Sequence, residues 1–319
     1  MAGEYLLQVE GLKKYFNLGK GRILHAVDDV SFAVRPGETL GLVGESGCGK
    51  TTVGRTLLKL YKPDGGRIIY RDEDVTHVPA RRQRELCCKM QMIYQDPYAS
   101  LNPFMTIGEI VSEGLEINKI GKDRAERQMM TYDLLEMVGL TKEHANRFPH
   151  EFSGGQRQRA GIARALAVNP EFVVCDEAIS ALDVSVQAQI INMLLDLREK
   201  MNLTYLFIAH DLSVVRYISQ RVAVMYLGKI VEIGSAAEVY AHPAHPYTQG
   251  LLNAVPVADP EFEKSKQYKA MTGEVSSPIN CKPGCRFASR CPRATEKCRT
   301  EDPLMKQVGP DHFVACHHL

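Results

Sequence analysis

The stretch GESGCGKT, residues 44–51, decides the fold of this 319-residue chain. It follows a short apolar segment, residues 39–43, that we expect to be a strand, and it runs into residues 50–60, which we expect to be a helix. Glycines let the backbone curl around a phosphate with its N–H groups pointing inward, and the helix N-terminus adds the positive end of its dipole. The stretch therefore predicts a phosphate-binding loop for a nucleotide.

Two side chains of this loop have an expected chemistry. Lys50 would bring a positive charge to the β- and γ-phosphates, and Thr51 would offer its hydroxyl to Mg²⁺. A chance glycine-rich turn is the alternative, which the flanking strand and helix disfavour. The residues expected to contact the nucleotide here are Gly44, Ser46, Gly47, Cys48, Gly49, Lys50, Thr51 and Thr52.

A second apolar segment, residues 172–175, ends in the two carboxylates Asp176 and Glu177. A buried strand would end in acids only at a cost in free energy, unless a cation or a bound water meets them. Asp176 suits the Mg²⁺ shell, and Glu177 suits the group that orients and polarises the attacking water. The alternative is a solvated strand end without a role, and the phosphate loop makes this reading the weaker one.

The segment FSGGQ, residues 152–156, follows the phosphate loop and resembles the signature of the ATP-binding-cassette (ABC) ATPases, with Phe152 where leucine is commoner. The resemblance implies that this segment caps the ATP held by an opposite subunit, so that ATP is half-bound until a partner closes over it. The residues of this chain that match the family signature, and to which the resemblance assigns this role, are Ser153, Gly154, Gly155 and Gln156.

The same resemblance implies further roles. Gln95 would touch Mg²⁺ and water, His210 would contact the γ-phosphate, and Tyr15 would stack on adenine. Core packing is an alternative for Tyr15, because another aromatic residue follows it, and a histidine at a strand end is commonly structural. Ala178 stands where the family usually has proline, yet every reacting group is present, so the resemblance implies an active ATP hydrolase.

The order of the segments predicts an α/β fold. Strand-like and helical segments alternate, which is typical of a parallel sheet covered by helices. The resemblance adds an antiparallel β subdomain and a helical subdomain at about residues 96–167. We expect the ATPase domain to cover residues 1–255 and a cysteine-rich extension to cover residues 256–319.

Four longer strings narrow the resemblance to the ATPases of oligopeptide and dipeptide permeases: QDPYASLNP (95–103), VSVQAQ (184–189), HPYTQ (245–249) and GCRFASRCP (284–292). It implies a bacterial importer with a second, usually non-identical, ATPase subunit, two membrane permease subunits and an extracellular solute-binding protein. Nickel importers share much of the pattern, so nickel or another small solute is an alternative cargo. A soluble ABC ATPase without a transport role is a rival of another class, disfavoured because no coiled coil or basic surface is visible.

The formal net charge of +1 gives no strong field of one sign for nucleic acid or an anionic membrane. No stretch approaches the roughly 18–20 uninterrupted apolar residues of a membrane span. The N-terminal residues lack a basic region followed by an apolar run, so no export signal is expected. We expect a peripheral subunit at the cytoplasmic face of the cell membrane.

Five of the nine cysteines crowd into the C-terminal segment. A secreted disulfide scaffold would be short and would follow a signal peptide, so a metal centre is the first hypothesis. Four thiolates suit either a [4Fe–4S] cluster or tetrahedral Zn²⁺. Wide spacings and the permease resemblance favour iron–sulfur, while zinc and free or disulfide-bonded thiols stay open. The expected ligands are Cys285, Cys291, Cys298 and Cys316, with Cys281 as a spare. Three histidines are possible ligands too, but histidines near a C-terminus are more often solvated, which is what we expect of His312, His317 and His318.

Overall fold

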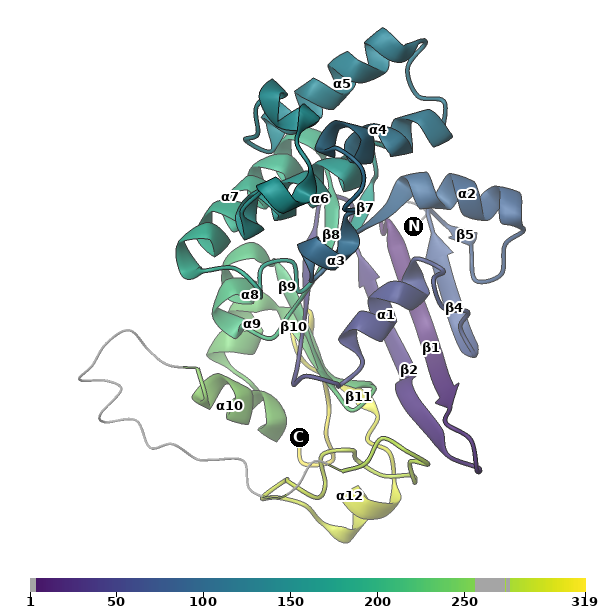
Figure 1. Cartoon of the computed structure of the whole chain (residues 1–319). Helices are drawn as coiled ribbons and strands as arrows, with labels where there is room; N and C mark the ends of the chain where they lie inside the picture. Colours follow the sequence, from purple (N-terminus) through teal and green to yellow (C-terminus); the bar gives the residue numbers. More distant parts are fainter. Residues whose placement is uncertain (1–3, 256–272, 274–275) are drawn as a thin grey trace, which may run out of the picture. The chain divides into compact units, whose positions relative to one another are not determined.

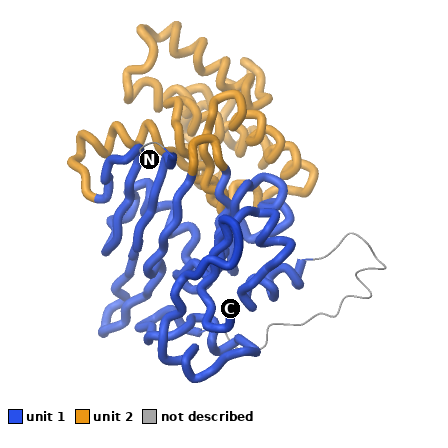
Figure 2. The backbone as a smooth tube through the Cα atoms, turned by 180° about the vertical axis from the view of Figure 1, so that it is seen from behind, with its two compact units in different colours: residues 1–34, 39–76, 209–319 blue, residues 35–38, 77–208 orange. Residues whose placement is uncertain are grey.

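The computed structural model describes residues 4–255, 273 and 276–319, and the chain divides into two compact units, shown in different colours in Figure 2. Unit 1 comprises residues 1–34, 39–76 and 209–319, and unit 2 comprises residues 35–38 and 77–208. The C-terminal cysteine-rich segment thus belongs to the same unit as the phosphate loop.

An antiparallel sheet opens unit 1 (Figure 1). Its order is β2-β1-β4-β5, formed by β1 (Leu7–Asn17), β2 (Ile23–Val34), β4 (Gly65–Tyr70) and β5 (Glu73–Asp74). Leu7, Val9 and Leu12 are buried along β1, and Val27 and Val30 are buried along β2. These apolar side chains anchor the antiparallel β subdomain that the family resemblance implied.

The second sheet of unit 1 is mixed. The strand β3 (Thr39–Val43) pairs in parallel with β9 (Arg221–Tyr226), which forms an antiparallel hairpin with β10 (Lys229–Ser235). Leu227 and Gly228 both have positive φ, at 41° and 84°, as a tight two-residue turn of this kind requires. The turn therefore joins β9 and β10 into a tight hairpin.

Two C-terminal strands extend this sheet. The strand β12 (His312–Ala315) pairs antiparallel with β10, and β11 (Met305–Gly309) pairs with β12. Among its described residues, unit 1 has the helices α1 (Lys50–Leu57), α8 (Leu212–Ile218), α9 (Ala236–Ala241), α10 (Pro246–Asn253) and α12 (Glu296–Thr300). Helix α8 lies close against β3, since a Cβ on Gly41 would be only 2.4 Å from Cγ1 of Val215.

Unit 2 contains three parallel strands in the order β6-β7-β8, each buried over most of its length. They are β6 (Met90–Ile93), β7 (Phe172–Asp176) and β8 (Thr204–Ala209), accompanied by α2 (Ala80–Lys89) and α7 (Val184–Met201). The chain between β6 and β7 is the predicted helical insert. It forms α3 (Pro97–Ser100), α4 (Ile107–Ile117), α5 (Arg124–Met137), the 3-10 turns η1 (Lys142–Asn146) and η2 (Pro149–Glu151), and α6 (Gly154–Leu166).

In the part of the chain that the structure describes, none of the helices has both the length and the apolar character needed to span a bilayer.

Candidate active site

The phosphate loop of unit 1 connects β3 to α1, and its glycines have separate structural causes. A Cβ on Gly44 would be 2.1 Å from the carbonyl oxygen of Met225, and one on Gly49, where φ is 110°, would be 2.1 Å from that of Ala26. Gly47 also has positive φ, at 77°, but its Cβ would meet no atom within 4 Å. The neighbouring strands therefore require Gly44 and Gly49, while Gly47 leaves the loop backbone open to a ligand.

Lys50 lies inside this loop. Its side chain is buried, and its Nζ donates to the carbonyl oxygens of Gly44 at 2.8 Å and Glu45 at 3.0 Å. Burial raises the pKa of the Cys48 thiol, the dominant effect over the opposing charge of Lys50, so the thiol beside the ammonium stays neutral. The loop curls around a single positive charge, which is the arrangement that a polyphosphate needs.

Two contacts within unit 1 fix the loop backbone. The N–H of Gly228, in the β9–β10 turn, donates to the carbonyl oxygen of Cys48 at 2.8 Å. The N–H of Glu45 donates to the hydroxyl of Tyr247, in α10, at 2.9 Å. Of the other predicted loop residues, Thr51 and Thr52 are half-buried and Ser46 is exposed.

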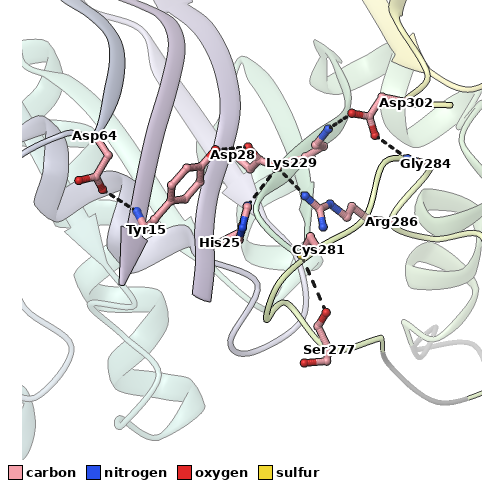
Figure 3. Close-up of polar contacts among 10 residues, drawn as sticks. All are labelled: Tyr15, His25, Asp28, Asp64, Lys229, Ser277, Cys281, Gly284, Arg286 and Asp302. Atoms are coloured by element: carbon pink, nitrogen blue, oxygen red, sulfur yellow. Dashed lines mark hydrogen bonds and ion pairs between the residues drawn. The ribbon is translucent and has the colours of Figure 1, made fainter. Parts of the chain in front are cut away.

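Tyr15, in β1, is half-buried and hydrogen-bonded (Figure 3). Its hydroxyl donates to Oδ1 of Asp28 at 2.6 Å, and its ring centroid lies 4.4 Å from that of His25. Burial and the hydrogen bond to Asp28 raise the pKa of Tyr15. Burial alone would raise the pKa of Asp28, but the Tyr15 hydroxyl and the charges of Lys229 and Arg286 outweigh it and lower that pKa. Asp28 therefore stays ionised and holds the tyrosine hydroxyl.

The two carboxylates predicted at the end of β7 differ in backbone conformation. Asp176 is buried, whereas Glu177 is half-buried and has a φ of 47°. This left-handed conformation costs a residue other than glycine about 1–3 kcal/mol and is concentrated at functional sites. The Glu177 N–H donates to the carbonyl oxygen of Ile208 at 3.0 Å, and the Glu177 carbonyl accepts from the Ser180 N–H at 3.1 Å, so the strained residue is held on both sides.

Gln95 and Glu177 are two predicted residues that the structure brings together. Gln95 follows β6 and Glu177 follows β7, and these neighbouring strands are parallel, so their carboxyl ends meet at one edge of the sheet. Nε2 of Gln95 donates to Oε2 of Glu177 at 2.8 Å. The amide therefore orients the carboxylate that is expected to act on water.

The signature segment begins α6 with a capping box. The Ser153 hydroxyl accepts from the Gln156 N–H at 3.3 Å, and the Gln156 side chain accepts from the Ser153 N–H at 3.0 Å. Gly155 is required by packing, because its Cβ would be 2.6 Å from Cγ1 of Val186 in α7. Ser153 and Gly154 are exposed, so the positive end of the α6 dipole faces solvent, where it can receive an anion.

His210 directly follows β8 and is exposed, as a group that meets a bound ligand must be. Ala178 is buried, with only 1% of its surface exposed, so a small apolar residue fills the place where the family usually has proline.

The four cysteines expected to bind metal lie in one region of unit 1. Burial first, and then the neighbouring thiols of Cys298, Cys291 and Cys316, raise the pKa of Cys285 to about 11. Within the described residues, however, no group of three or more His, Cys, Asp or Glu side chains is placed to hold a metal ion. Tetrahedral Zn²⁺ requires thiolates about 2.3 Å from a common centre, so these thiols do not fit a single ion as they stand. The predicted iron–sulfur cluster is likewise not confirmed.

The prediction that His312 is solvated is wrong. His312, in β12, is 3% exposed, and its Nε2 lies 2.8 Å from Oε1 of the fully buried Glu232 in β10. The other two histidines have partners as well: His317 contacts the carbonyl oxygen of Glu301 at 3.0 Å, and Nε2 of His318 lies 3.4 Å from Sγ of Cys298. His312 therefore stabilises the pairing of β12 with β10.

Sequence reasoning missed three charged residues beside the residues expected to bind the nucleotide. Asp28 holds Tyr15, Arg286 pairs with Asp28 at 2.5 Å, and Arg290 pairs with Glu45 of the phosphate loop at 2.9 Å. The sequence does place both arginines within residues 284–292, between two of the cysteines. Since a buried arginine is usually paired with an acid, this position could have suggested that they have partners.

Three features of the chain are together typical of an ATP-binding-cassette ATPase. They are the phosphate loop that precedes α1, the two carboxylates at the end of β7, and the helix α6, which begins with a serine cap followed by two glycines. The family model described as ABC transporter matches residues 27–180, and the model described as the C-terminal region of oligopeptide/dipeptide transporters matches residues 231–298.

Relatives with known names agree with these matches. The oligopeptide transport ATP-binding protein OppF of Bacillus subtilis strain 168 is 56% identical over 98% of this chain and 96% of its own length. AppF of the same organism, also an oligopeptide transport ATP-binding protein, is 49% identical over 98% of this chain and 97% of its own length. A dimeric post-hydrolysis structure of the ATP-binding cassette MJ0796, bound to ADP and Pi, superposes with a TM-score of 0.66 at 27% identity, covering 72% of this chain and 98% of that chain. The chain therefore belongs to the ATP-binding subunits of oligopeptide/dipeptide ABC transporters.

Proposed function

We propose that this chain is one of two ATPase subunits that energise a bacterial importer of oligopeptides or dipeptides. The names of OppF and AppF and the matched C-terminal family region support peptides as the cargo. The other components would be a non-identical ATPase subunit, two membrane permease subunits and an extracellular solute-binding protein. The chain would work as a peripheral subunit at the cytoplasmic face of the membrane.

The hydrogen bond between Gln95 and Glu177 carries the proposed ATPase mechanism. Glu177 accepts a proton from the attacking water, and Gln95 keeps the carboxylate pointed at the place where that water binds. His210 donates to the γ-phosphate. Mg²⁺, when bound, neutralises charge on the phosphates, and Thr51, Gln95 and Asp176 would hold it through a hydroxyl, an amide oxygen and a carboxylate, the oxygen ligands that this ion prefers.

On the nucleotide, the backbone of residues 44–51 and Lys50 hold the phosphates, with Thr52 beside them, and Tyr15 stacks on the adenine. Ser153, Gly154, Gly155 and Gln156 act on the ATP of the opposite subunit. Support comes from the capping box, in which the Ser153 oxygen accepts a hydrogen bond and its own proton remains available to a phosphate. Two subunits closing over two ATP molecules bind ATP more tightly than separate ones do, and this difference supplies the drive for transport.

We further propose that residues 1–255 form the ATPase domain and that residues 256–319 are a cysteine-rich extension to it, of which residues 256–272, 274 and 275 lie outside the described residues. The donor set of Cys285, Cys291, Cys298 and Cys316 is the chemical support for a [4Fe–4S] cluster there, with Zn²⁺ as the alternative. Anaerobic purification with metal analysis and an absorption spectrum tests the assignment: about four irons per chain are expected, and stoichiometric zinc or no metal would contradict it.

The change Glu177→Gln tests the ATPase mechanism in the assembled transporter. Glutamine keeps the shape of the side chain but cannot take a proton from water, so hydrolysis should fall by about 10²- to 10⁴-fold. ATP binding should persist, because the phosphate loop is unchanged. Glu199→Gln is the matched control, since it makes the same change at an exposed position of α7. Hydrolysis by Glu177→Gln at the parent rate would remove Glu177 from the mechanism.

The cargo is tested separately with the same assembled transporter and its binding protein. Short peptides should stimulate ATP hydrolysis, whereas Ni²⁺ should not. Stimulation by Ni²⁺ without stimulation by peptides would overturn the proposed cargo and leave the ATPase mechanism standing.

A further inference from the structure

The C-terminal segment, residues 276–319, lies against the hairpin that β1 and β2 form in unit 1. The Asn280 N–H donates to the carbonyl oxygen of Ile23 at 2.8 Å, and the Asn280 side-chain oxygen accepts from the Ile23 N–H at 2.8 Å. The His25 N–H donates to the carbonyl oxygen of Pro278 at 2.9 Å. These backbone contacts place the segment beside β2, the strand that carries Asp28.

Arg286 of this segment reaches Tyr15 through one carboxylate (Figure 3). Nη2 of Arg286 donates to Oδ2 of Asp28 at 2.5 Å, while Oδ1 of the same carboxylate accepts from the Tyr15 hydroxyl at 2.6 Å. The Arg286 and Asp28 side chains are only 10% and 13% exposed, so solvent screens this pair weakly. The guanidinium fixes the carboxylate, and the carboxylate fixes the tyrosine.

The loop that carries Arg286 is itself held in place. The Gly284 N–H donates to Asp302 at 3.0 Å, and Asp302 forms an ion pair with Lys229 of β10, also at 3.0 Å (Figure 3). The Cys285 N–H donates to the carbonyl oxygen of Cys298 at 2.8 Å. The position of Arg286 therefore depends on the folded state of the cysteine-rich segment.

Arg290 makes the corresponding contact on the phosphate side. Its Nη1 lies 2.9 and 3.1 Å from the two carboxylate oxygens of Glu45, within the phosphate loop. The Arg290 side chain is 8% exposed, and its guanidinium lies 5.9 Å from the ring centroids of both Tyr226 and Phe287. Phe287, which is 1% exposed, packs against Tyr247, whose hydroxyl accepts from the Glu45 N–H. The segment thus neutralises an acid that would otherwise repel a polyphosphate.

We propose that Arg286 and Arg290 are positioning residues through which the C-terminal segment sets the affinity of this subunit for ATP. Arg286 acts on the adenine side through Asp28 and Tyr15, and Arg290 acts on the phosphate side through Glu45. The inference rests on the proposed roles of Tyr15 and the phosphate loop. Arg286 is next in sequence to Cys285, and Arg290 is next to Cys291. A shift in the position of either cysteine therefore moves the adjoining arginine, which contacts Asp28 or Glu45.

The two arginines should affect the binding of different parts of the nucleotide. This difference distinguishes a positioning role from a general loss of structure, which would weaken the binding of all ligands. With the purified full chain, Arg286→Ala should weaken binding of Mg-ATP by about 5- to 10-fold and leave binding of Mg-tripolyphosphate, which has no base, unchanged. Equal weakening of both ligands would overturn the adenine-side role.

Arg290→Ala should weaken both ligands by a similar factor, about 5- to 10-fold, because the Glu45 carboxylate is left unpaired beside the phosphates. Adding Glu45→Gln removes that charge and should restore most of the lost affinity. Failure of the second change to restore affinity would show that charge at Glu45 is not the route.

Arg293→Ala is the matched control, because it makes the same change at an exposed position of the same segment and should leave both affinities at the parent value. If Arg286→Ala prevents folding, Asp28→Asn tests the same chain of contacts with the arginine intact, and it should also weaken ATP selectively. Unchanged ATP affinity in Asp28→Asn and Arg286→Ala would overturn the inference.

Tyr15→Ala distinguishes this inference from the proposed function. Weaker ATP binding in Tyr15→Ala with no effect of Arg286→Ala would leave the adenine role of Tyr15 standing and reject the role of Arg286. Unchanged ATP binding in Tyr15→Ala would reject the adenine role itself, and with it the route through Arg286.

Discussion

At the scale of single residues, Lys50 stabilises the fold of the phosphate loop. Its ammonium is buried and satisfied by the carbonyl oxygens of Gly44 and Glu45, so the charge that phosphates need is already in place. Because the Lys50 side chain is already ordered, less free energy is lost to ordering it when ATP binds.

Lys50→Ala should therefore weaken Mg-ATP binding by about 10- to 100-fold, the equivalent of one strong charge-assisted hydrogen bond. Isothermal titration of the purified chain measures this. Lys62→Ala removes an exposed lysine that follows α1 and should bind ATP normally. Equal affinities of the Lys50 and Lys62 variants would argue against Lys50 as a phosphate ligand.

The sequence could predict residues whose function depends on local spacing. Lys50, Asp176 and Ser153 were found because a loop, a strand end and a helix start each place them within a few residues of their neighbours. Arg286 could not be found in this way, because its partner Asp28 is 258 positions distant along the chain. A buried charge requires a partner of opposite charge, but the sequence alone does not identify that partner.

At the scale of secondary structure elements, α10 begins at a histidine with an unusual environment. Nδ1 of His245 accepts from the Tyr247 N–H at 3.1 Å, so the ring must be neutral to cap the helix. Burial lowers the pKa of His245 from 6.5 to about 4. The unfolded chain therefore binds a proton at a higher pH than the folded chain does.

The stability that this creates is present above pH 6.5 and is lost as the pH falls toward 4. His245→Asn keeps a side-chain oxygen that can cap α10 but cannot be protonated. Its free energy of unfolding should fall less steeply over this pH range, and the difference from the parent should approach about 3 kcal/mol at the acid end. Chemical denaturation at several pH values measures it, and parallel pH curves for the two proteins would contradict it.

The predicted elements were most accurate where one pattern dominated. The strand at residues 39–43 was predicted without error because every one of its residues is buried and apolar or small. The strand β1 continues through two lysines to Asn17, since pairing with β2 overrides the low strand propensity of Lys13 and Lys14. The strands β11 and β12 were missed because the cysteines and prolines of that region suggested a loop-rich metal site.

At the scale of the whole molecule, the proposed ATPase site is completed by a second ATPase subunit. If Ser153 acts on the ATP of an opposite subunit, hydrolysis per chain should rise with the concentration of an equimolar mixture of this chain and its partner ATPase subunit. The rate should approach second-order dependence on concentration at high dilution, because association limits it there. Measurements of phosphate release over a hundredfold dilution series test this.

A specific activity that stays constant on dilution, for a protein shown to be monomeric by light scattering, would contradict the shared site. Ser153→Ala supplies the internal comparison. It should lower the maximal rate at high protein concentration while leaving ATP binding to dilute protein intact, because the phosphate loop that binds ATP first is its own.

Contacts between the two ends of unit 1 have a consequence for the order of folding. The hydrogen bonds from residue 280 to residue 23 join positions separated by 257 along the chain. Closing so long a loop costs conformational entropy before any stabilising contact has formed. Contacts between residues this distant in sequence therefore slow folding. Unit 2, of which residues 77–208 are continuous, can form from nearer contacts. We therefore expect unit 2 to become structured early, and the packing of residues 276–319 against β2 to form later.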